Sequence, residues 1–126
     1  MPFRKEVNRK RSICRGVFLL WVALALLPRA SEAQNLDIIQ VKEGVYAAIG
    51  KAGKVVGANA AIILHDEGVT IVDTHISPKA ARELVGEVKK LSDKPVTEVI
   101  NTHFHFDHTN GNQVFFPQAL IVGHQE

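Results

Sequence analysis

Cysteine is nearly absent from this sequence, and its single copy is Cys14. No internal disulfide can form, and residues 34–126 offer no cysteine thiolate as a metal ligand. Cys14 also precedes the apolar run near the N-terminus, so it does not lie where a lipoprotein acylation site would. The missing disulfides are compatible with export but do not argue for it.

A long apolar run is missing as well. The run VFLLWVALALL, residues 17–27, is shorter than the roughly 20 residues that an ordinary membrane span needs. It follows a basic start and precedes Ser31 and Ala33, small residues at the two positions that a signal peptidase reads. We therefore expect a signal peptide over residues 1–33, cleaved after Ala33, and a secreted or periplasmic product without a stable membrane anchor. An uncleaved anchor is the alternative, and the export route stays open.

A net positive charge is missing outside this leader. Residues 1–33 contain seven basic and two acidic residues, whereas residues 34–126 contain eight basic and eleven acidic ones. The overall net charge of +2 therefore comes from the leader. Because the remainder has no basic cluster, we expect no nucleic acid as a partner.

Local patterns predict the elements of residues 34–126. Short runs rich in β-branched and apolar residues, bounded by turn signals, predict strands over residues 36–41, 45–49, 59–64, 69–72, 96–101 and 119–123. Ser77 as cap, Pro78 in the first turn and apolar residues at helical spacing up to Leu91 predict a helix. This helix would join the strands on either side of it in a parallel βαβ unit. A short helix is expected around residues 113–116.

Four potential metal ligands lie within the six-residue run HFHFDH. They are His103, His105, Asp107 and His108. Imidazole and carboxylate are ligand types that zinc favours. In an extended segment the first three would share one face, while Phe104 and Phe106 would face the other and anchor the loop in a core. His108 breaks the alternation and would approach a second ion beside Asp107.

Two metal ions about 3.5–4 Å apart would suit a hydrolase, because together they polarise a substrate oxygen and hold an attacking hydroxide. The motif directly follows the predicted strand 96–101, and open α/β sheets generally place their ligands at the carboxyl ends of strands. The alternative is an exposed polar loop whose histidines make ordinary hydrogen bonds.

From residue 101 to 112 the sequence NTHFHFDHTNGN resembles the metallo-β-lactamase-fold superfamily, with supporting similarity over residues 41–123. The resemblance implies an α/β fold, the N-terminal half of a four-layer αββα sandwich, with residues 34–126 as a partial, truncated domain. It also implies two Zn²⁺ ions, the first bound by His103 and His105 and the second by Asp107 and His108. Asp107 would also orient the hydroxide, a catalytic role.

The resemblance implies an exported zinc-dependent hydrolase in which a metal-bound hydroxide attacks an amide or ester-type bond of a small-molecule substrate. β-Lactams are candidates, and so are lactones, thioesters, phosphoesters and alkyl sulfates. Because the remaining family ligands would lie beyond residue 126, we expect weak or no activity from the chain as given. A non-catalytic exported metal-binding remnant and a di-iron redox protein are the alternatives.

Other polar residues carry weaker expectations. In the family an aspartate at the position of Asp73 orients the metal loop, residues 101–112 here, through hydrogen bonds. The alternative is an ordinary strand-end carboxylate that binds nearby backbone amides. We expect His75 to be a surface or loop residue and His65 to be solvated. His124 is not expected to be a ligand.

Glycines mark two loops. Asn110 and Gly111 tolerate left-handed backbone angles and would turn the chain sharply after His108. Residues 50–57 contain three glycines and predict a mobile hairpin loop, which in the family often lies over the active site. A substrate flap and a simple flexible hairpin both remain open there.

Overall fold

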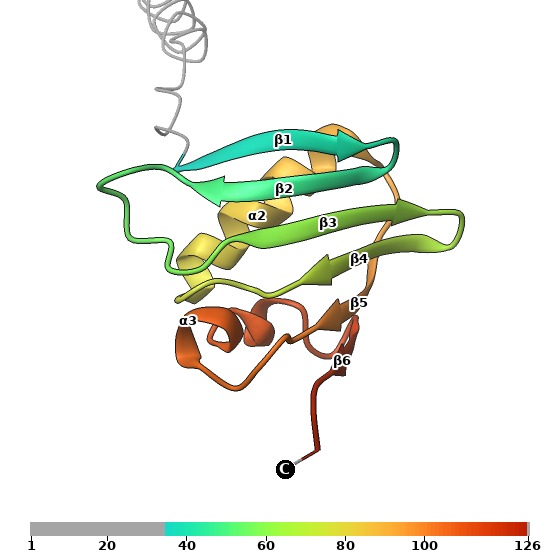
Figure 1. Cartoon of the computed structure of the whole chain (residues 1–126). Helices are drawn as coiled ribbons and strands as arrows, with labels where there is room; N and C mark the ends of the chain where they lie inside the picture. The colour runs from blue at the N-terminus through green and yellow to red at the C-terminus, as the bar shows by residue number, and fades with distance from the viewer. Residues whose placement is uncertain (1–34, 126) are drawn as a thin grey trace, which may run out of the picture. The chain divides into compact units, whose positions relative to one another are not determined.

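The computed structural model describes residues 35–125, so the expected leader and its cleavage site lie outside the described part. Six strands form one sheet in the order β1-β2-β3-β4-β5-β6 (Figure 1). The strands are β1 (Leu36–Lys42), β2 (Val45–Gly50), β3 (Ala60–His65), β4 (Gly68–Val72), β5 (Val96–Ile100) and β6 (Leu120–Val122). Each predicted strand is present, and no predicted end differs from the observed one by more than one residue.

The sheet combines two modes of pairing. β1 to β4 pair antiparallel through hairpins, whereas β4, β5 and β6 run parallel. In the first hairpin Gly44 adopts a φ of +73°, a left-handed conformation that glycine accepts without steric cost. The change from antiparallel to parallel pairing places the carboxyl ends of β4 and β5 at the same edge of the sheet.

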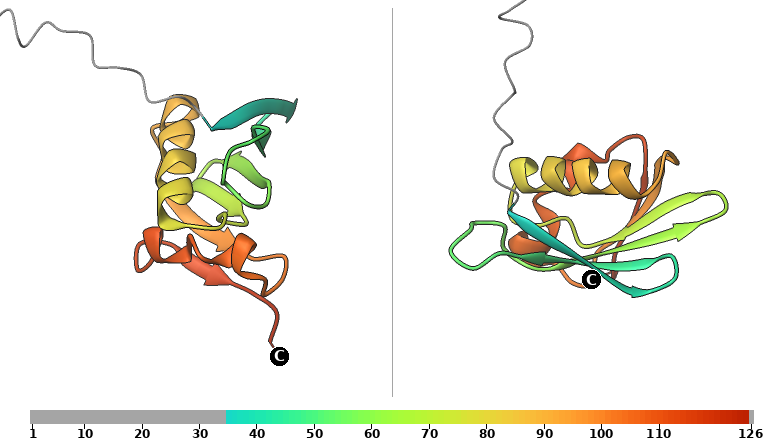
Figure 2. Two further views of the ribbon diagram at one scale, coloured as in Figure 1. Left: turned by 90° about the vertical axis from the view of Figure 1, so that its left-hand side faces the viewer. Right: turned by 90° about the horizontal axis from the view of Figure 1, so that it is seen from above.

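Helix α2 (Pro78–Leu91) crosses from β4 to β5 and makes these strands parallel, as predicted. The Ser77 hydroxyl caps it by accepting a 3.2 Å hydrogen bond from the Ala80 amide. The helix packs against one face of the sheet through Ala81, Leu84 and Val88, which are all buried (Figure 2). Within residues 35–125 no helix is long and apolar enough to cross a membrane.

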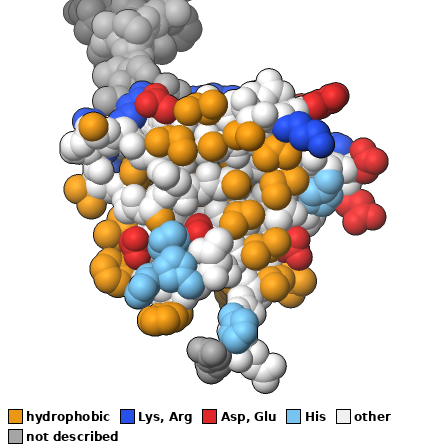
Figure 3. Space-filling model, in the orientation of Figure 1, with side chains coloured by type: hydrophobic (Ala, Val, Ile, Leu, Met, Phe, Trp, Pro, Cys, Tyr) orange, Lys and Arg blue, Asp and Glu red, His pale blue; other side chains and the backbone are white. Residues whose placement is uncertain are grey.

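The two faces of the sheet differ in burial. On the face toward α2, Ile62, Ile71 and Val99 are cross-strand neighbours and are fully buried. On the opposite face an apolar row crosses all six strands and consists of Ile39, Ala47, Ala61, Val72, Ile100 and Val122. No member of this row is buried, and Figure 3 shows hydrophobic side chains spread over this face. The described residues therefore form one helix layer on one sheet layer.

Candidate metal centre

The predicted ligands follow β5, as expected, but their local conformation differs from the prediction. Asp107 and His108 lie in the short helix α3 (Phe106–Thr109), so the extended conformation predicted for HFHFDH is wrong. The Asn110 amide donates to the Phe106 carbonyl at 3.0 Å and closes this turn. Phe104 and Phe106 are 84% and 62% exposed, so neither anchors the loop in a core.

The four predicted ligands nevertheless lie together. The ring centroid of His103 is 4.7 Å from that of His105 and 4.1 Å from that of His108. Oδ2 of Asp107 lies 3.6 Å from Nε2 of His108. Histidine side chains form a visible cluster at one edge of the face in Figure 3. A turn into α3 therefore gathers the three side chains expected on one face and adds His108 to them.

Asp73, at the end of β4, connects to this cluster through both carboxylate oxygens. Oδ1 accepts a 2.9 Å hydrogen bond from the Thr102 amide, and Oδ2 accepts one of 2.8 Å from the Thr102 hydroxyl. Oδ2 also lies 2.7 Å from Nδ1 of His108. Burial opposes ionisation of Asp73, but the hydrogen bonds from Thr102 and His108 outweigh it and lower the pKa of the carboxyl. Asp73 is thus an ionised acceptor that orients the metal loop, the contact expected from the resemblance.

This carboxylate determines the tautomers of two histidines. Because ionised Asp73 can only accept, Nδ1 of His108 carries a proton, and Nε2 of the neutral ring is the nitrogen with the free lone pair. The Thr102 hydroxyl uses its one proton on Asp73, so at 3.0 Å from Nδ1 of His103 it acts as acceptor. His103 therefore also has a free Nε2 lone pair. A buried carboxylate that fixes imidazole tautomers in this way is the usual support of metal-ligating histidines.

The resemblance implies zinc, and three imidazoles with one carboxylate match the donors that zinc favours. The free Nε2 atoms of His103 and His108 agree with that role. Within residues 35–125, however, no three His, Cys, Asp or Glu side chains form a group that could hold a metal ion. A catalytic zinc usually takes three protein ligands. The described residues therefore fit zinc in donor chemistry and supply only part of a coordination sphere.

Thr74, Asn101 and Asn112, which the sequence analysis did not select, also hold the loop that contains HFHFDH through hydrogen bonds. The amide of buried Thr74 donates to the His108 carbonyl at 2.8 Å. The Thr74 hydroxyl donates to Oδ1 of Asn112, also at 2.8 Å. Asn112 in turn donates to Oδ1 of Asn101 at 2.6 Å. These amides flank the motif in the sequence, but nothing in a linear pattern indicates that they pair with each other.

His75 lies in the loop between β4 and α2, one of the two positions predicted for it, but it is fully buried, so a surface position is wrong. Its Nδ1 lies 2.6 Å from the Ala58 carbonyl, which makes Nδ1 the protonated nitrogen, while Nε2 is buried without a hydrogen-bond partner. Desolvation lowers the pKa of His75 and favours the neutral ring. Asp73 and His75 both have positive φ, at 62° and 66°, which is uncommon outside glycine. These angles let one short segment bond to both the metal loop and the β2–β3 loop.

The explanation expected for the turn after His108 is also wrong. Asn110 and Gly111 have φ of −63° and −78°, so neither is left-handed. Glycine is required at 111 for a different reason, since a Cβ there would overlap the Thr74 carbonyl oxygen and lie 2.7 Å from the Ala81 Cβ. Close approach of the metal loop to Thr74 and α2, not turn geometry, explains Gly111.

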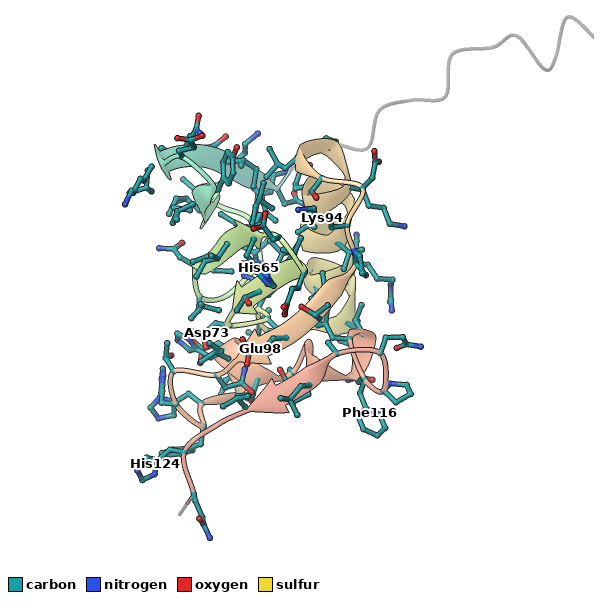
Figure 4. The ribbon with its side chains drawn as sticks, turned by 90° about the vertical axis from the view of Figure 1, so that its right-hand side faces the viewer. His65, Asp73, Lys94, Glu98, Phe116 and His124 are labelled. Carbon is teal, nitrogen blue, oxygen red and sulfur yellow. The ribbon has the colours of Figure 1, made fainter. Side chains whose placement is uncertain are left out.

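The remaining histidines lie outside this cluster. His65 is half-buried at the end of β3, where Nε2 is 3.3 Å from the Thr70 hydroxyl, so it is less solvated than predicted. His124 is exposed, and Figure 4 shows it on the segment after β6, pointing away from the sheet. A pocket of about 480 Å³ beside the motif is lined by His103, Phe104 and His124 among others. His124 thus lies near the motif without joining its hydrogen-bond network.

The comparison with protein families agrees with the fold. A model of the metallo-β-lactamase superfamily matches residues 53–122, which include β3 to β6 and the whole HFHFDH motif. This chain belongs to the metallo-β-lactamase superfamily.

The chain is similar to curated proteins of two kinds, an alkylsulfatase and metallo-β-lactamases. The chain is 47% identical over 55 residues to the linear primary-alkylsulfatase of Pseudomonas sp. (strain ATCC 19151), a match that covers 44% of this chain and 10% of the relative. It is 31% identical over 84 residues to the metallo-β-lactamase type 2 of Bacillus cereus, covering 64% of this chain and 33% of the relative. The chain thus spans a third or less of the length of these curated relatives.

Solved structures show the same fold at lower identity. A metallo-β-lactamase from Pontibacter korlensis superposes with a TM-score of 0.61 at 23% identity, covering 71% of this chain and 44% of that one. The FIM-1 metallo-β-lactamase from Pseudomonas aeruginosa, solved in its mono-zinc form, gives 0.60 at 17% identity, covering 74% and 44%. The described sheet and helix therefore match somewhat less than half of a metallo-β-lactamase, as the four-layer expectation requires.

Proposed function

We propose that this chain belongs to an exported, zinc-dependent hydrolase in which HFHFDH forms the first part of a two-ion site. The observation that carries the proposal is the Asp73 carboxylate, which leaves the Nε2 atoms of His103 and His108 free beside His105 and Asp107. Export is supported by the leader pattern of residues 1–33 alone, and we propose a secreted or periplasmic location for the product.

Each side chain has a distinct task in this proposal. His103 and His105 hold the first ion, and Asp107 and His108 hold the second. Zinc bound there supplies a Lewis acid that polarises the scissile bond and lowers the pKa of a water molecule. Asp107 orients the attacking water by accepting its hydrogen bond. Asp73 keeps the proton of His108 on Nδ1 throughout, so that Nε2 stays available.

The substrate is a small molecule in this proposal, with no nucleic-acid partner. The names of the relatives point to two bond types, the β-lactam amide and the alkyl sulfate ester. Both are broken by attack of water at an electrophilic centre next to a developing negative charge, which a divalent cation stabilises. A chromogenic β-lactam and a primary alkyl sulfate are therefore the first substrates to assay.

Calorimetric titration of the full chain with zinc tests the proposal, with His103→Ala as the variant and His65→Ala as a matched control outside the cluster. We expect weak binding that is reduced in His103→Ala and unchanged in His65→Ala. Equal binding by the parent and His103→Ala would contradict the metal site.

A non-catalytic exported metal-binding remnant is the alternative. It predicts tight zinc binding by this chain alone, with no hydrolysis of either substrate. The absence, within residues 35–125, of three converging ligands favours weak binding instead. The same titration, followed by the two hydrolysis assays, separates the two functions.

A further inference from the structure

The loop between β2 and β3 is fixed at its base, although its three glycines predicted a mobile hairpin. The Ile76 amide donates to the Val56 carbonyl at 3.1 Å, and Nδ1 of His75 donates to the Ala58 carbonyl at 2.6 Å. Val56 is also buried, at 3% exposure. The residues on both sides of Gly57 are therefore bonded to the segment that follows Asp73.

Gly57 lies in the narrow space between this segment and the metal loop. Its φ is +77°, and a Cβ built on it would lie 2.7 Å from the Ile76 Cβ and 3.2 Å from the Asp107 Cβ. Non-bonded carbon atoms normally approach to about 3.5–4.0 Å. Any side chain at position 57 must therefore displace Ile76, Asp107 or the loop itself.

The contacts indicate which neighbour would move. The loop is held at Val56 and Ala58, and Ile76 is held by its amide and by its carbonyl, which accepts from Nδ2 of Asn110 at 3.2 Å. Asp107 belongs to α3, a helix of four residues with none buried. Asp107 is therefore the less restrained of the two neighbours, whereas the closer contact, with Ile76, must be relieved by Ile76 or by the loop itself.

We infer that Gly57 is a positioning residue for Asp107: the absence of a side chain at 57 lets Asp107 lie close to His108, where the metal site needs it. The role of Asp107 as a metal ligand rests on the proposed function, but its steric contact with position 57 is independent of any metal. The β2–β3 loop thereby becomes part of the site, because the backbone at Gly57 lies against Asp107.

Gly53 provides a matched control in the same loop. Its φ is +75°, almost the value at Gly57, and a Cβ there would meet no atom within 4 Å. Alanine at either position adds the same strain of a left-handed backbone. Only Gly57→Ala adds contacts with Ile76 and Asp107, so the difference between the two variants separates these contacts from backbone strain. The resonances of Ile76 and of Asp107 then tell the two contacts apart.

The experiment compares the full chain with its Gly57→Ala and Gly53→Ala variants. Amide chemical shifts of the metal-free proteins report the position of α3, and a cobalt(II) titration followed by visible absorption reports affinity and ligand geometry. We expect Gly57→Ala to shift the resonances of Asp107 and His108, to alter the cobalt spectrum and to weaken binding by roughly 10-fold or more, the size seen when support of a ligand is lost. Gly53→Ala should match the parent in all three.

Shifts confined to residues 52–58 and 74–78 in Gly57→Ala, with parental cobalt binding, would overturn the inference. If the parent itself binds no cobalt, the proposed function fails, and the metal-free shifts alone decide whether Gly57 positions Asp107. Should Gly57→Ala not fold, Gly57→Asn and Gly53→Asn form a second pair with less backbone strain, because asparagine tolerates positive φ. The same shifts are expected for that pair.

Discussion

Helix α2 and the metal loop, residues 101–112, are held to the same sheet by different interactions. α2 buries four side chains against the sheet, whereas α3 within the loop buries none. The loop is instead held by hydrogen bonds with residues 73–76. Thr74 donates to the loop, whereas the Asp73 carboxylate and the carbonyls of His75 and Ile76 accept from it.

The two regions are expected to control different properties, the stability of the fold and the geometry of the metal site. Burial of apolar surface is the larger and less specific contribution, so α2 should govern the free energy of unfolding. Hydrogen bonds to a carboxylate fix direction and tautomer, so residues 73–76 should govern ligand geometry. Variants in the two regions are therefore expected to affect different measurements.

The largest effect is expected from Leu84→Ala, which empties a fully buried position on α2. Loss of a buried leucine side chain costs about 2–5 kcal/mol of unfolding free energy. Urea denaturation should show this loss, while Arg82→Ala on the exposed side of the helix should change little. The folded fraction of Leu84→Ala should keep the parental cobalt affinity. A large fall in affinity would show that the two regions are not separable.

Asp73→Asn tests the other region. Asparagine has a similar shape and tolerates the φ of +62°, but it cannot hold a proton on Nδ1 of His108 by charge. We expect metal affinity to fall by about 10–100-fold. Asp66→Asn, in the exposed β3–β4 turn, is the control and should leave the affinity unchanged. Calorimetric titration with zinc measures both, and parental binding by Asp73→Asn would refute the supporting role.

The buried ring of His75 predicts a pH dependence. Its pKa is lowered from 6.5 by desolvation, so below about pH 6.5 the unfolded chain takes up a proton that the folded chain does not. Stability is therefore full above pH 6.5 and falls as the pH drops toward the folded pKa, by at most about 1.4 kcal/mol per pH unit.

Urea denaturation at pH 7.5 and 5.5 measures this dependence. His75→Asn should show a shallower fall than the parent, while exposed His124→Gln should keep the parental slope. Equal slopes for the parent and His75→Asn would contradict the assignment to His75.

The smallest effect is expected at the surface. Nζ of Lys51 lies 3.3 Å from Oδ1 of Asp37, but solvent screens this ion pair. Lys51→Ala should lower the unfolding free energy by less than about 1 kcal/mol and leave metal affinity unchanged. Thermal unfolding checks the first expectation. A loss as large as that of Leu84→Ala would mean that the pair supports the sheet.

Local patterns predicted most of the scaffold because its signals are local. Strands followed from runs of β-branched residues, and α2 followed from Ser77, Pro78 and the apolar spacing up to Leu91. The identity of the four ligand candidates and the contact of Asp73 with the loop also followed from the sequence and the resemblance. Their roles as ligands remain predictions.

The conformation of the site could not be predicted in the same way. A four-residue helix such as α3 has no periodicity to detect, so the alternation in HFHFDH predicts an extended segment instead. The positive φ of Asp73 and His75 depends on tertiary contacts that no linear pattern contains. The need for glycine at 57 and 111 likewise comes from neighbours distant in the sequence.

The Asp73 carboxylate, bound directly to His108 and to His103 through the Thr102 hydroxyl, holds the proton on Nδ1 of both neutral rings and frees Nε2 on each. Long-range proton–nitrogen correlation spectra of the metal-free full chain, at a pH where the imidazoles are neutral, report these tautomers directly. We expect the Nδ1–H form for both rings in the parent and a mixture of forms in Asp73→Asn. Nε2–H tautomers at His103 and His108 in the parent would contradict it.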